Sequence, residues 1–261
     1  MREKSLSKKS RYCQLITYEN KNKVFDPFND FEQAGYLRNH YGEKDPAIVR
    51  QLEHTMFRAG LDEALAYLAG RDVLCYEDFL EVHRILFEAF YPWAGQDRAM
   101  TAPNCAVSKA DTMFCHPHDA RLAIEQGLRL GQNAESMRQR PGEVMGFFAY
   151  GHPFLDGNGR TMLIIHNELC HRAGFSIDWS ITNKVDYLRA LSAEIESPSK
   201  GLLDNYLCQF IDGIRDRNLW GESINGIRGL DGQSIENCVD GEYTDIAVAQ
   251  KYRSFKMNRE L

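Results

Sequence analysis

The sequence predicts a mainly α-helical protein. Apolar residues recur at the three-to-four-residue spacing of a helix along most of the chain, whereas the strict alternation typical of strands is scarce. No internal repeat and no low-complexity tract interrupts this pattern. Of the 261 residues, 43% are hydrophobic, which is enough for one main domain with a sizeable core. We therefore expect a compact helical bundle with short additions at both ends.

Two helices open the predicted domain. Asp45 and Pro46 are typical of an N-cap and a first helical residue, and apolar residues then recur at helical spacing until Gly70. A second helix is predicted at about 76–90, before a Tyr-Pro-Trp-Ala-Gly segment. Residues 99–117 lack this periodicity and predict an irregular loop or a hairpin. Further helices are expected at about 119–131, 141–150, 159–173, 184–196, 201–218 and 244–256.

Both ends differ in composition from the middle. Residues 1–23 carry seven Lys and Arg against two Glu, and we interpret them as a basic, mostly solvated arm in which residues 12–18 could form an edge strand. Residues 24–218 form the predicted main domain. The Gly- and Asp-rich residues 219–261 form a predicted C-terminal extension.

Charge and composition exclude several classes of protein. The formal net charge is −6, without the concentrated basic face that nucleic-acid binding usually needs. No run of about 18 apolar residues is present, and no apolar stretch follows the N-terminal lysines, so we expect neither a membrane span nor a secretory signal. The seven scattered cysteines favour reduced thiols over a disulfide framework. We expect a cytoplasmic protein that binds neither nucleic acid nor a membrane.

One segment, residues 152–160, combines groups suited to phosphoryl transfer. It joins two apolar helical patterns, so it predicts a loop that leads into a helix N-terminus. Gly157 and Gly159 allow the backbone to turn sharply and to approach a ligand closely. The helix N-terminus favours an anion, and a bound phosphate would explain Arg160 in the first helical turn. A short Gly-rich string of this kind can also be an ordinary turn.

Two further side chains complete this segment. Asp156 offers hard oxygen ligands of the kind that hold Mg²⁺ on phosphates. His152 can be neutral at cytosolic pH and can take a proton from a hydroxyl. A base, a metal ligand, an anion-binding helix end and a guanidinium within nine residues indicate phosphoryl-transfer chemistry.

The complete string, His-Pro-Phe-Leu-Asp-Gly-Asn-Gly-Arg, resembles the signature of Fic-domain proteins, His-Pro-Phe-x-Asp/Glu-Gly-Asn-Gly-Arg, at all nine positions. The resemblance extends beyond the motif. His83 and the Trp-Ala-Gly segment at 93–95 look like the family's helix and the turn that follows it. Residues 108–114 lie where the family has its target-docking flap, so the span from about 47 to 215 is covered in the right order.

The resemblance implies a Fic-like helical bundle with a small flap hairpin and an AMP transferase activity. Most members of the family transfer AMP from ATP to a Tyr, Thr or Ser hydroxyl of a protein substrate. By resemblance His152 is the general base, Asp156 the Mg²⁺ ligand and Arg160 a catalytic phosphate contact. The residues implied in nucleotide binding are Phe154, Gly157, Asn158, Gly159 and Arg160, and those of the target-docking flap are Val107, Ser108 and Lys109.

Two features depart from the family pattern. The second motif arginine, which grips the terminal phosphate, is replaced by Leu163. A donor other than ATP (UTP, CDP-choline or a phosphate donor) therefore remains an alternative, as does a non-catalytic Fic-fold binding protein. The inhibitory signature Ser/Thr-x-x-x-Glu-Gly/Asn is also incomplete: Ser192 and Glu196 have its spacing, but Ser197 follows. We expect no self-inhibition through a Glu–Arg pair. A separate inhibitor protein, or none, stays open, as does delivery into a target cell's cytosol if the protein is an effector.

Overall fold

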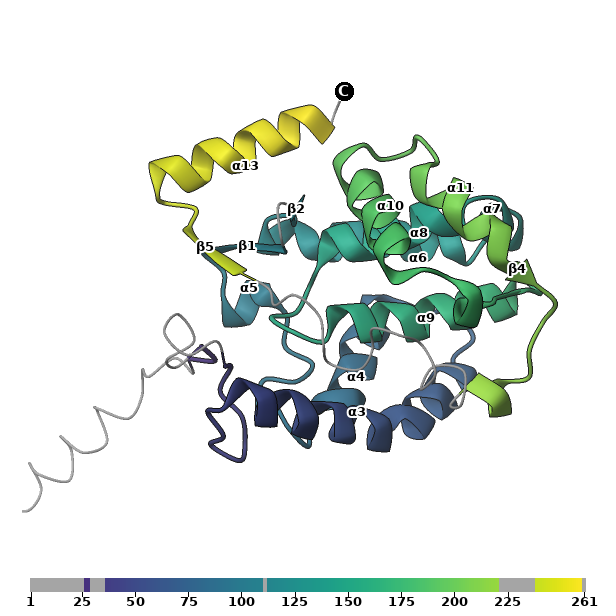
Figure 1. Cartoon of the computed structure of the whole chain (residues 1–261), viewed down its shortest axis with the longest axis horizontal. Helices are drawn as coiled ribbons and strands as arrows, with labels where there is room; N and C mark the ends of the chain where they lie inside the picture. The colour runs from purple at the N-terminus through teal and green to yellow at the C-terminus, as the bar shows by residue number, and fades with distance from the viewer. Residues whose placement is uncertain (1–25, 29–35, 110–111, 221–237, 260–261) are drawn as a thin grey trace, which may run out of the picture.

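A computed structural model of the chain describes residues 26–28, 36–109, 112–220 and 238–259. The mainly helical class expected from the sequence is confirmed (Figure 1). The long helices are α3 (Pro46–Ala69), α4 (Tyr76–Phe87), α6 (Ala120–Gly131), α8 (Pro141–Gly151), α9 (Asn158–Arg172), α10 (Lys184–Glu196) and α13 (Ile246–Arg259). Shorter ones are α5 (Arg98–Thr101), α7 (Ala134–Gln139) and α11 (Leu202–Leu207), with 3₁₀ turns η1 (Pro117–Asp119), η2 (Trp179–Ile181), η3 (Cys208–Phe210) and η4 (Arg217–Leu219).

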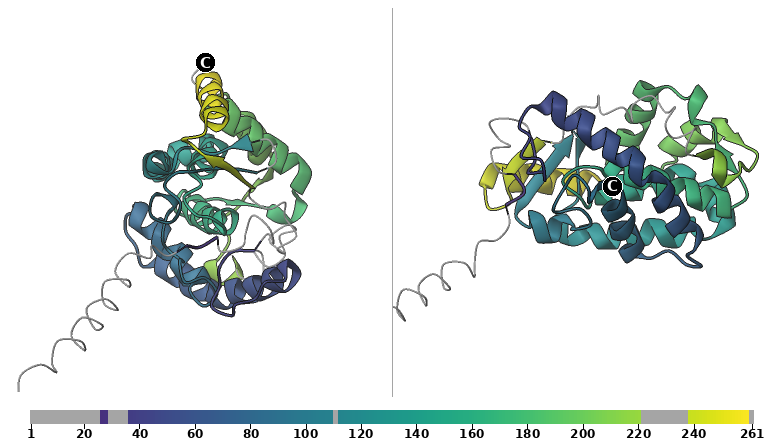
Figure 2. Two further views of the ribbon diagram at one scale, coloured as in Figure 1. Left: turned by 90° about the vertical axis from the view of Figure 1, so that its left-hand side faces the viewer. Right: turned by 90° about the horizontal axis from the view of Figure 1, so that it is seen from below.

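Helix α9 is at the centre of the bundle (Figures 1 and 2). Helices α4 and α8 pack against it, α6 and α10 pack on α8, and α3 covers α4. Most of the side chains of α9 are buried, including Leu163, Ile164 and Leu169 in the main apolar core. This arrangement places the N-terminal end of α9, where the motif lies, between the surrounding helices.

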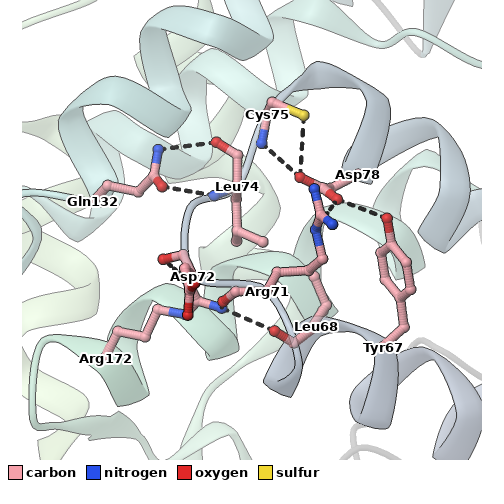
Figure 3. A network of polar contacts seen from close by, with 9 residues as sticks. All are labelled: Tyr67, Leu68, Arg71, Asp72, Leu74, Cys75, Asp78, Gln132 and Arg172. Carbon is pink, nitrogen blue, oxygen red and sulfur yellow. Dashed lines mark hydrogen bonds and ion pairs between the residues drawn. The ribbon is translucent and has the colours of Figure 1, made fainter.

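The end of α3 is tied to the end of α9 by Arg172 (Figure 3). Its guanidinium donates hydrogen bonds to the carbonyl oxygens of Leu68 (2.8 Å), Arg71 (2.7 Å) and Asp72 (3.1 Å). The last carbonyl groups of a helix have no partner within the helix, and a cation there is favourable. Arg172 therefore fixes how α3 lies along α9, and this alignment brings an acid of α3 to the motif.

Two small sheets accompany the helices. Strand β1 (Cys105–Lys109) pairs antiparallel with β2 (Thr112–Met113) on one side and with β5 (Cys238–Glu242) on the other. The hairpin expected within 99–117 is thus confirmed, whereas its third strand, from the C-terminal extension, was not predicted. Strands β3 (Ser176–Ile177) and β4 (Ile211–Asp212) form a second antiparallel pair.

Two predicted helix ends are wrong. Helix α4 ends at Phe87 and not at residue 90, where the Phe90 N–H bonds to the Phe87 carbonyl three residues back and the chain tightens into a turn. The helix expected at 201–218 ends at Leu207. Beyond η3 the chain becomes extended, since Ile211 pairs with Ile177 across β3 and β4. Tertiary pairing overrides the local helical pattern there.

Some expectations fall outside the described part of the chain. The basic arm at 1–23 and the possible strand at 12–18 lie there. Within the described ranges, no helix combines the length and apolar character that a membrane crossing requires.

Candidate active site

The motif loop begins where α8 ends, at His152. This residue has a left-handed backbone conformation (φ 38°, ψ 58°), which is unusual for a residue other than glycine. The fully buried Arg98 holds the backbone in place: its Nε donates to the His152 carbonyl (2.7 Å) and its main-chain N–H donates to the Pro153 carbonyl (2.6 Å). Arg98 thus stabilises the sharp exit from α8, a role that the sequence did not reveal.

The His152 imidazole is buried and stacks on the Phe114 ring, with 3.6 Å between ring centroids and planes 5° apart. Burial, together with the positive charges of Arg98 and Lys109, lowers the pKa of His152 well below its ordinary value. The ring is therefore neutral near pH 7. Its Nε2 atom has no hydrogen-bond partner among the described residues. A fixed, neutral imidazole with a free nitrogen is suited to accept a proton from a substrate hydroxyl.

Asn158 closes the loop by bonding across it. Its side-chain oxygen accepts from the Phe154 N–H (2.9 Å) and its side-chain nitrogen donates to the Phe154 carbonyl (2.7 Å). Phe154 itself is fully buried, and its ring stacks on His83 at 3.7 Å. Both side chains, implied by resemblance in nucleotide binding, therefore serve the shape of the loop. This leaves main-chain N–H groups of the first turn of α9 to meet an anion.

The two glycines of the loop have different roles. Gly157 has φ +79°, and a Cβ there would lie 2.6 Å from the Phe87 ring and 3.0 Å from the His83 ring, so packing and conformation both require glycine. A Cβ at Gly159 would meet no described atom within 4 Å. The first turn of α9 is thus open to a ligand at Gly159, where the helix N-terminus favours a phosphate.

Asp156 is placed to reach such a ligand. Its carboxylate is 44% exposed and lies 3.8 Å from the Arg160 guanidinium, and its Oδ1 accepts a 2.6 Å hydrogen bond from the Gly157 N–H. The described residues hold no group of three or more acidic, His or Cys ligands. Mg²⁺ needs none, because it usually binds through one or two carboxylates together with water and substrate phosphates. The site therefore fits a Mg²⁺ ion that arrives with a nucleotide.

Arg160 is less exposed than a surface phosphate ligand would be. Its guanidinium lies over the rings of Phe87 (4.7 Å) and Phe57 (5.5 Å), and its Nη2 donates to a carboxylate oxygen of Glu53 (2.8 Å). Its Nη1 is buried and has no partner among the described residues. One nitrogen is thus held by α3 while the other is left for a ligand.

Glu53 is a member of the site that the sequence analysis missed. It lies on α3, only 3% of its surface is exposed, and burial raises the pKa of its carboxyl group to about 7. The charge of Arg160 and hydrogen bonds from Arg160 and Tyr91 act in the opposite direction. The acid beside the motif arginine is therefore Glu53, whereas Glu196, at the C-terminal end of α10, is exposed.

His83 is a second contact whose role the sequence did not show. Its Nε2 bonds to the Asp156 carbonyl (3.0 Å), and its Nδ1 accepts from the Gly95 N–H (2.9 Å). The Gly95 bond makes Nδ1 the acceptor, so Nε2 carries the proton. Full burial lowers the pKa of His83 to about 3, which keeps the ring neutral. The Trp-Ala-Gly turn thereby fixes the tautomer of the histidine that supports the loop at Asp156.

The flap residues lie along β1 above the loop. Val107 and Ser108 are buried, and their Cα partners in β5 are Val239 and Cys238. Lys109 is half-buried at the end of the strand and forms no ion pair in the described part of the chain, and burial lowers the pKa of its ammonium group. The strand that carries the residues assigned by resemblance to target docking is therefore paired along one edge with this chain's own β5.

Leu163, in the place of the second motif arginine, is 5% exposed and belongs to the main core. It offers no donor to a ligand, and its burial in the core is consistent with a packing role.

Comparisons with known proteins agree with this geometry. Residues 73–170 match the model of the Fic/DOC family. The chain is 31% identical over 183 residues to protein adenylyltransferase VbhT of Bartonella schoenbuchensis, a match that covers 66% of this chain but only 36% of VbhT. It is 29% identical over 190 residues to probable protein adenylyltransferase y4lH of Sinorhizobium fredii, covering 69% of this chain and 92% of y4lH.

Solved structures share the fold at lower identity. BepC of Bartonella tribocorum, solved with bound AMPPNP, has a TM-score of 0.56 and 16% identity over 70% of this chain and 96% of its own. The N-terminal Fic domain of a putative cell filamentation protein of Bartonella quintana, solved with bound ADP, has a TM-score of 0.58 and 18% identity over 72% of this chain and 96% of its own. The fold implied by the sequence motif is confirmed.

Proposed function

We propose that this chain carries a Fic domain of the Fic/DOC family and is a protein adenylyltransferase, which moves AMP from ATP to a Tyr, Thr or Ser hydroxyl of a protein substrate. The observation that carries the proposal is the state of His152. Its ring is neutral and fixed against Phe114, and its buried Nε2 has no partner among the described residues, six residues before the start of α9 in the same motif. A base beside an anion site is the arrangement that this reaction needs.

The reaction uses each of these groups once. Nε2 of His152 accepts the proton of the substrate hydroxyl, and the hydroxyl oxygen forms a bond to the α-phosphorus of ATP. The bond between that phosphorus and the oxygen of the β-phosphate breaks, and pyrophosphate leaves with the electron pair. The main-chain N–H groups at Gly159 and the free Nη1 of Arg160 stabilise the negative charge on the phosphates.

Asp156 is the residue we assign to Mg²⁺. A bound ion would neutralise charge on the phosphates. The Gly157 N–H and the nearby Arg160 hold the carboxylate at the open side of the loop, and His83 fixes the carbonyl of the same residue. Asp156→Ala should lower activity strongly, and added Mg²⁺ should not restore it. Normal Mg²⁺ dependence in this variant would place the ligand elsewhere.

The test of the proposed function compares wild type with His152→Ala. Both proteins are incubated with α-labelled ATP and a cell lysate, and calorimetric titration with ATP measures binding separately. We expect the variant to lose transfer by about 10²–10⁴-fold, the usual contribution of a general base, and to keep most of its ATP binding. Equal labelling by the two proteins would contradict the assignment of His152. Absence of labelling by both proteins would contradict the proposed adenylyltransferase activity.

A second candidate is favoured by Leu163, which is buried and provides no grip for a third phosphate. On this alternative ATP is replaced by another donor. The donor is CDP-choline, which lacks a γ-phosphate, or it is UTP or a phosphate donor. Parallel labelling with each donor separates the alternatives. If the lysate is labelled only with another donor, that donor replaces ATP in the proposal.

We also propose that the reaction takes place in a cytosol, either that of the producing cell or that of a target cell. Cys75, Cys105, Cys115, Cys170 and Cys208 form no disulfide in the described part of the chain, which agrees with a reducing compartment. A separate inhibitor protein remains compatible with this proposal, since the region 192–197 lacks the full inhibitory signature.

A further inference from the structure

The outer edge of the flap is covered by a segment from the far end of the chain. Cys105, Ala106, Val107 and Ser108 of β1 have Glu242, Gly241, Val239 and Cys238 of β5 as their Cα partners. Figure 1 shows β5, in yellow, beside β1, with α13 beyond it. The strand that would receive a target segment is therefore the middle strand of a three-stranded sheet, in the order β2-β1-β5.

The hydrogen-bonding direction of β1 singles out one flap residue. The Phe114 N–H donates to the Val107 carbonyl (3.2 Å), so the polar backbone groups of Val107 face β2. Neighbouring residues of a strand face opposite sides, so those of Ser108 face β5 and those of Lys109 face β2. Ser108 is thus the flap residue next to the active site whose N–H and C=O point to the outer edge.

The pairing of β5 is built to be weak. A bulge lies between Ala106 and Val107, where Asp240 has no partner on β1, and the strand contains Asp, Gly and Glu, which are depleted in strands. Behind it lies a satellite cluster, separate from the main core, of three buried residues, Ala106, Met113 and Val248, with three partly buried aromatic residues packed against it. The Asp240 carboxylate pairs with Lys251 of α13 (3.0 Å) and not with β1. Such a segment can open at much lower cost than the core of the bundle.

The distal part of α13 has contacts of its own that do not involve β5. The Tyr252 hydroxyl accepts from the His116 N–H (2.9 Å), and the Arg259 guanidinium lies over the Tyr150 ring at 3.5 Å. These contacts hold the helix near the flap whether or not β5 is paired. The released strand therefore stays close, and its re-pairing is an intramolecular event at high effective concentration.

We propose that the outer edge of β1 is one docking surface with two alternative occupants, the chain's own β5 and an extended segment of the protein substrate. The inference rests on the proposed function. A target segment would replace β5 strand for strand, so the backbone groups of Ser108 stay hydrogen-bonded throughout. Main-chain pairing sets the register of the segment with little demand on its sequence. Its hydroxyl side chain would then enter beside His152, whose ring stacks on Phe114 at the end of the same hairpin.

The register offers a reversible test with a single substitution. Tyr243 N–H donates to the Asn104 carbonyl, so the adjacent pair, Cys105 and Glu242, does not exchange hydrogen bonds and its Cα atoms are close. Cys105 forms no disulfide in the described part of the chain, and Glu242 is exposed. The Glu242→Cys variant should therefore form a disulfide with Cys105 on mild oxidation, which locks β5 on β1. Peptide mapping verifies the bond, and the double variant with Cys105→Ser is the matched control.

Transfer and nucleotide binding are measured on the locked and the reduced protein. The probes are α-labelled ATP with a cell lysate for transfer and calorimetry with ATP for binding. We expect the locked protein to lose at least tenfold in lysate labelling, to bind ATP unchanged, and to recover on reduction, while the double variant is insensitive to oxidation. Equal labelling by the locked and reduced protein would overturn the inference and leave the proposed function intact. Absence of labelling in both states and in wild type would contradict the proposed function, and this inference with it.

Hydrogen exchange gives a second readout that needs no substrate. If β5 opens while the hairpin stays closed, the Ser108 amide exchanges faster than the Lys109 amide, which faces β2. The disulfide should slow exchange at Ser108 to the level of Lys109. Slow exchange at Ser108 already in the reduced protein would show that β5 does not leave the edge, and would refute the two-occupant surface.

Discussion

Glu53 of α3 and Arg160 of α9 form a buried ion pair with 2.8 Å between Oε1 and Nη2. The pair lies at the open first turn of α9, where we expect the phosphates to bind. Glu53 has two opposite effects there. Its hydrogen bond holds the guanidinium in position over Phe87, while its negative charge offsets the charge that Arg160 can offer to a phosphate.

Glu53→Gln separates these two effects. The amide oxygen keeps an acceptor for Arg160 but removes the negative charge, so we expect ATP to bind about fivefold more tightly at pH 8, a change of ~1 kcal/mol. Glu53→Ala also removes the acceptor, and there we expect weaker binding and slower transfer. Calorimetric titration with ATP measures binding, and labelling with α-labelled ATP measures transfer.

The matched control is Glu168→Gln. Glu168 is equally buried and pairs with Arg172 and Arg217 at the other end of α9. Its substitution should change stability without changing ATP affinity. If both Glu→Gln variants shift ATP binding alike, or if Gln and Ala at position 53 act in the same direction, Glu53 has only a structural role.

The pH dependence of stability provides an independent prediction for Glu53. Its pKa is about 7 in the folded protein, because burial outweighs the attraction of Arg160, and about 4.5 when it is unfolded. Between these values the folded protein binds more protons than the unfolded one, so this group's stabilisation is present at pH 4 and is lost as pH rises through 7. Tyr91 and Asp156 also face Glu53 and are unchanged in the variant.

We expect wild type to lose stability relative to Glu53→Gln when pH rises from 5 to 8. Urea denaturation of both proteins at the two pH values, without nucleotide or metal, measures the difference. Parallel pH profiles for the two proteins would show that the carboxyl group titrates at an ordinary value.

Glu53 also shows what the sequence can and cannot predict. It lies four residues after Val49 and four before Phe57, both buried, so helical spacing alone places an acid on the apolar face of α3. That signal was available, since buried acids are nearly always paired. Its partner lies 107 residues away, and no local pattern indicates that distance.

The turn of the motif loop was predictable because the contacts that shape it are local, whereas its distant supports, Arg98 and His83, were not predictable. Asn158 bonds to Phe154 four residues before it, and Gly157 turns the chain by its own conformation. The pairing of β5 with β1 was not predictable, because β5 has a weak strand composition and its partner lies more than 120 residues away. The strand β4 was not predictable either, because its pairing with β3 is a tertiary contact that ends the helix predicted there.

A third prediction concerns His83, whose two nitrogens have separate partners. In His83→Gln the amide can still donate to the Asp156 carbonyl, whereas in His83→Asn the shorter side chain can still accept from the Gly95 N–H. If the contact with Asp156 is the one that positions the metal ligand, the His83→Gln variant retains more activity than the His83→Asn variant and needs less Mg²⁺. Initial rates over a Mg²⁺ titration test this, with thermal denaturation to match the variants for stability. Equal Mg²⁺ dependence in both would limit His83 to packing against Phe154.

The last prediction concerns Leu163, which lies one helical turn after Arg160 on α9. It is 5% exposed, so an arginine there must bring its charge to the edge of the core, and a charge left without a partner would cost on the order of 3 kcal/mol. The long side chain can avoid that cost only by reaching the anion site beside Arg160. We therefore expect Leu163→Arg to be destabilised without ligand, to regain stability with ATP more than with ADP, and to bind ATP more tightly relative to ADP than wild type does. Thermal denaturation and calorimetry with both nucleotides measure these effects, and Leu163→Met, which keeps an apolar side chain of similar volume, is the control. A folded Leu163→Arg protein that binds ATP and ADP in the wild-type ratio would show that this position does not govern the γ-phosphate, and that packing alone accounts for the leucine.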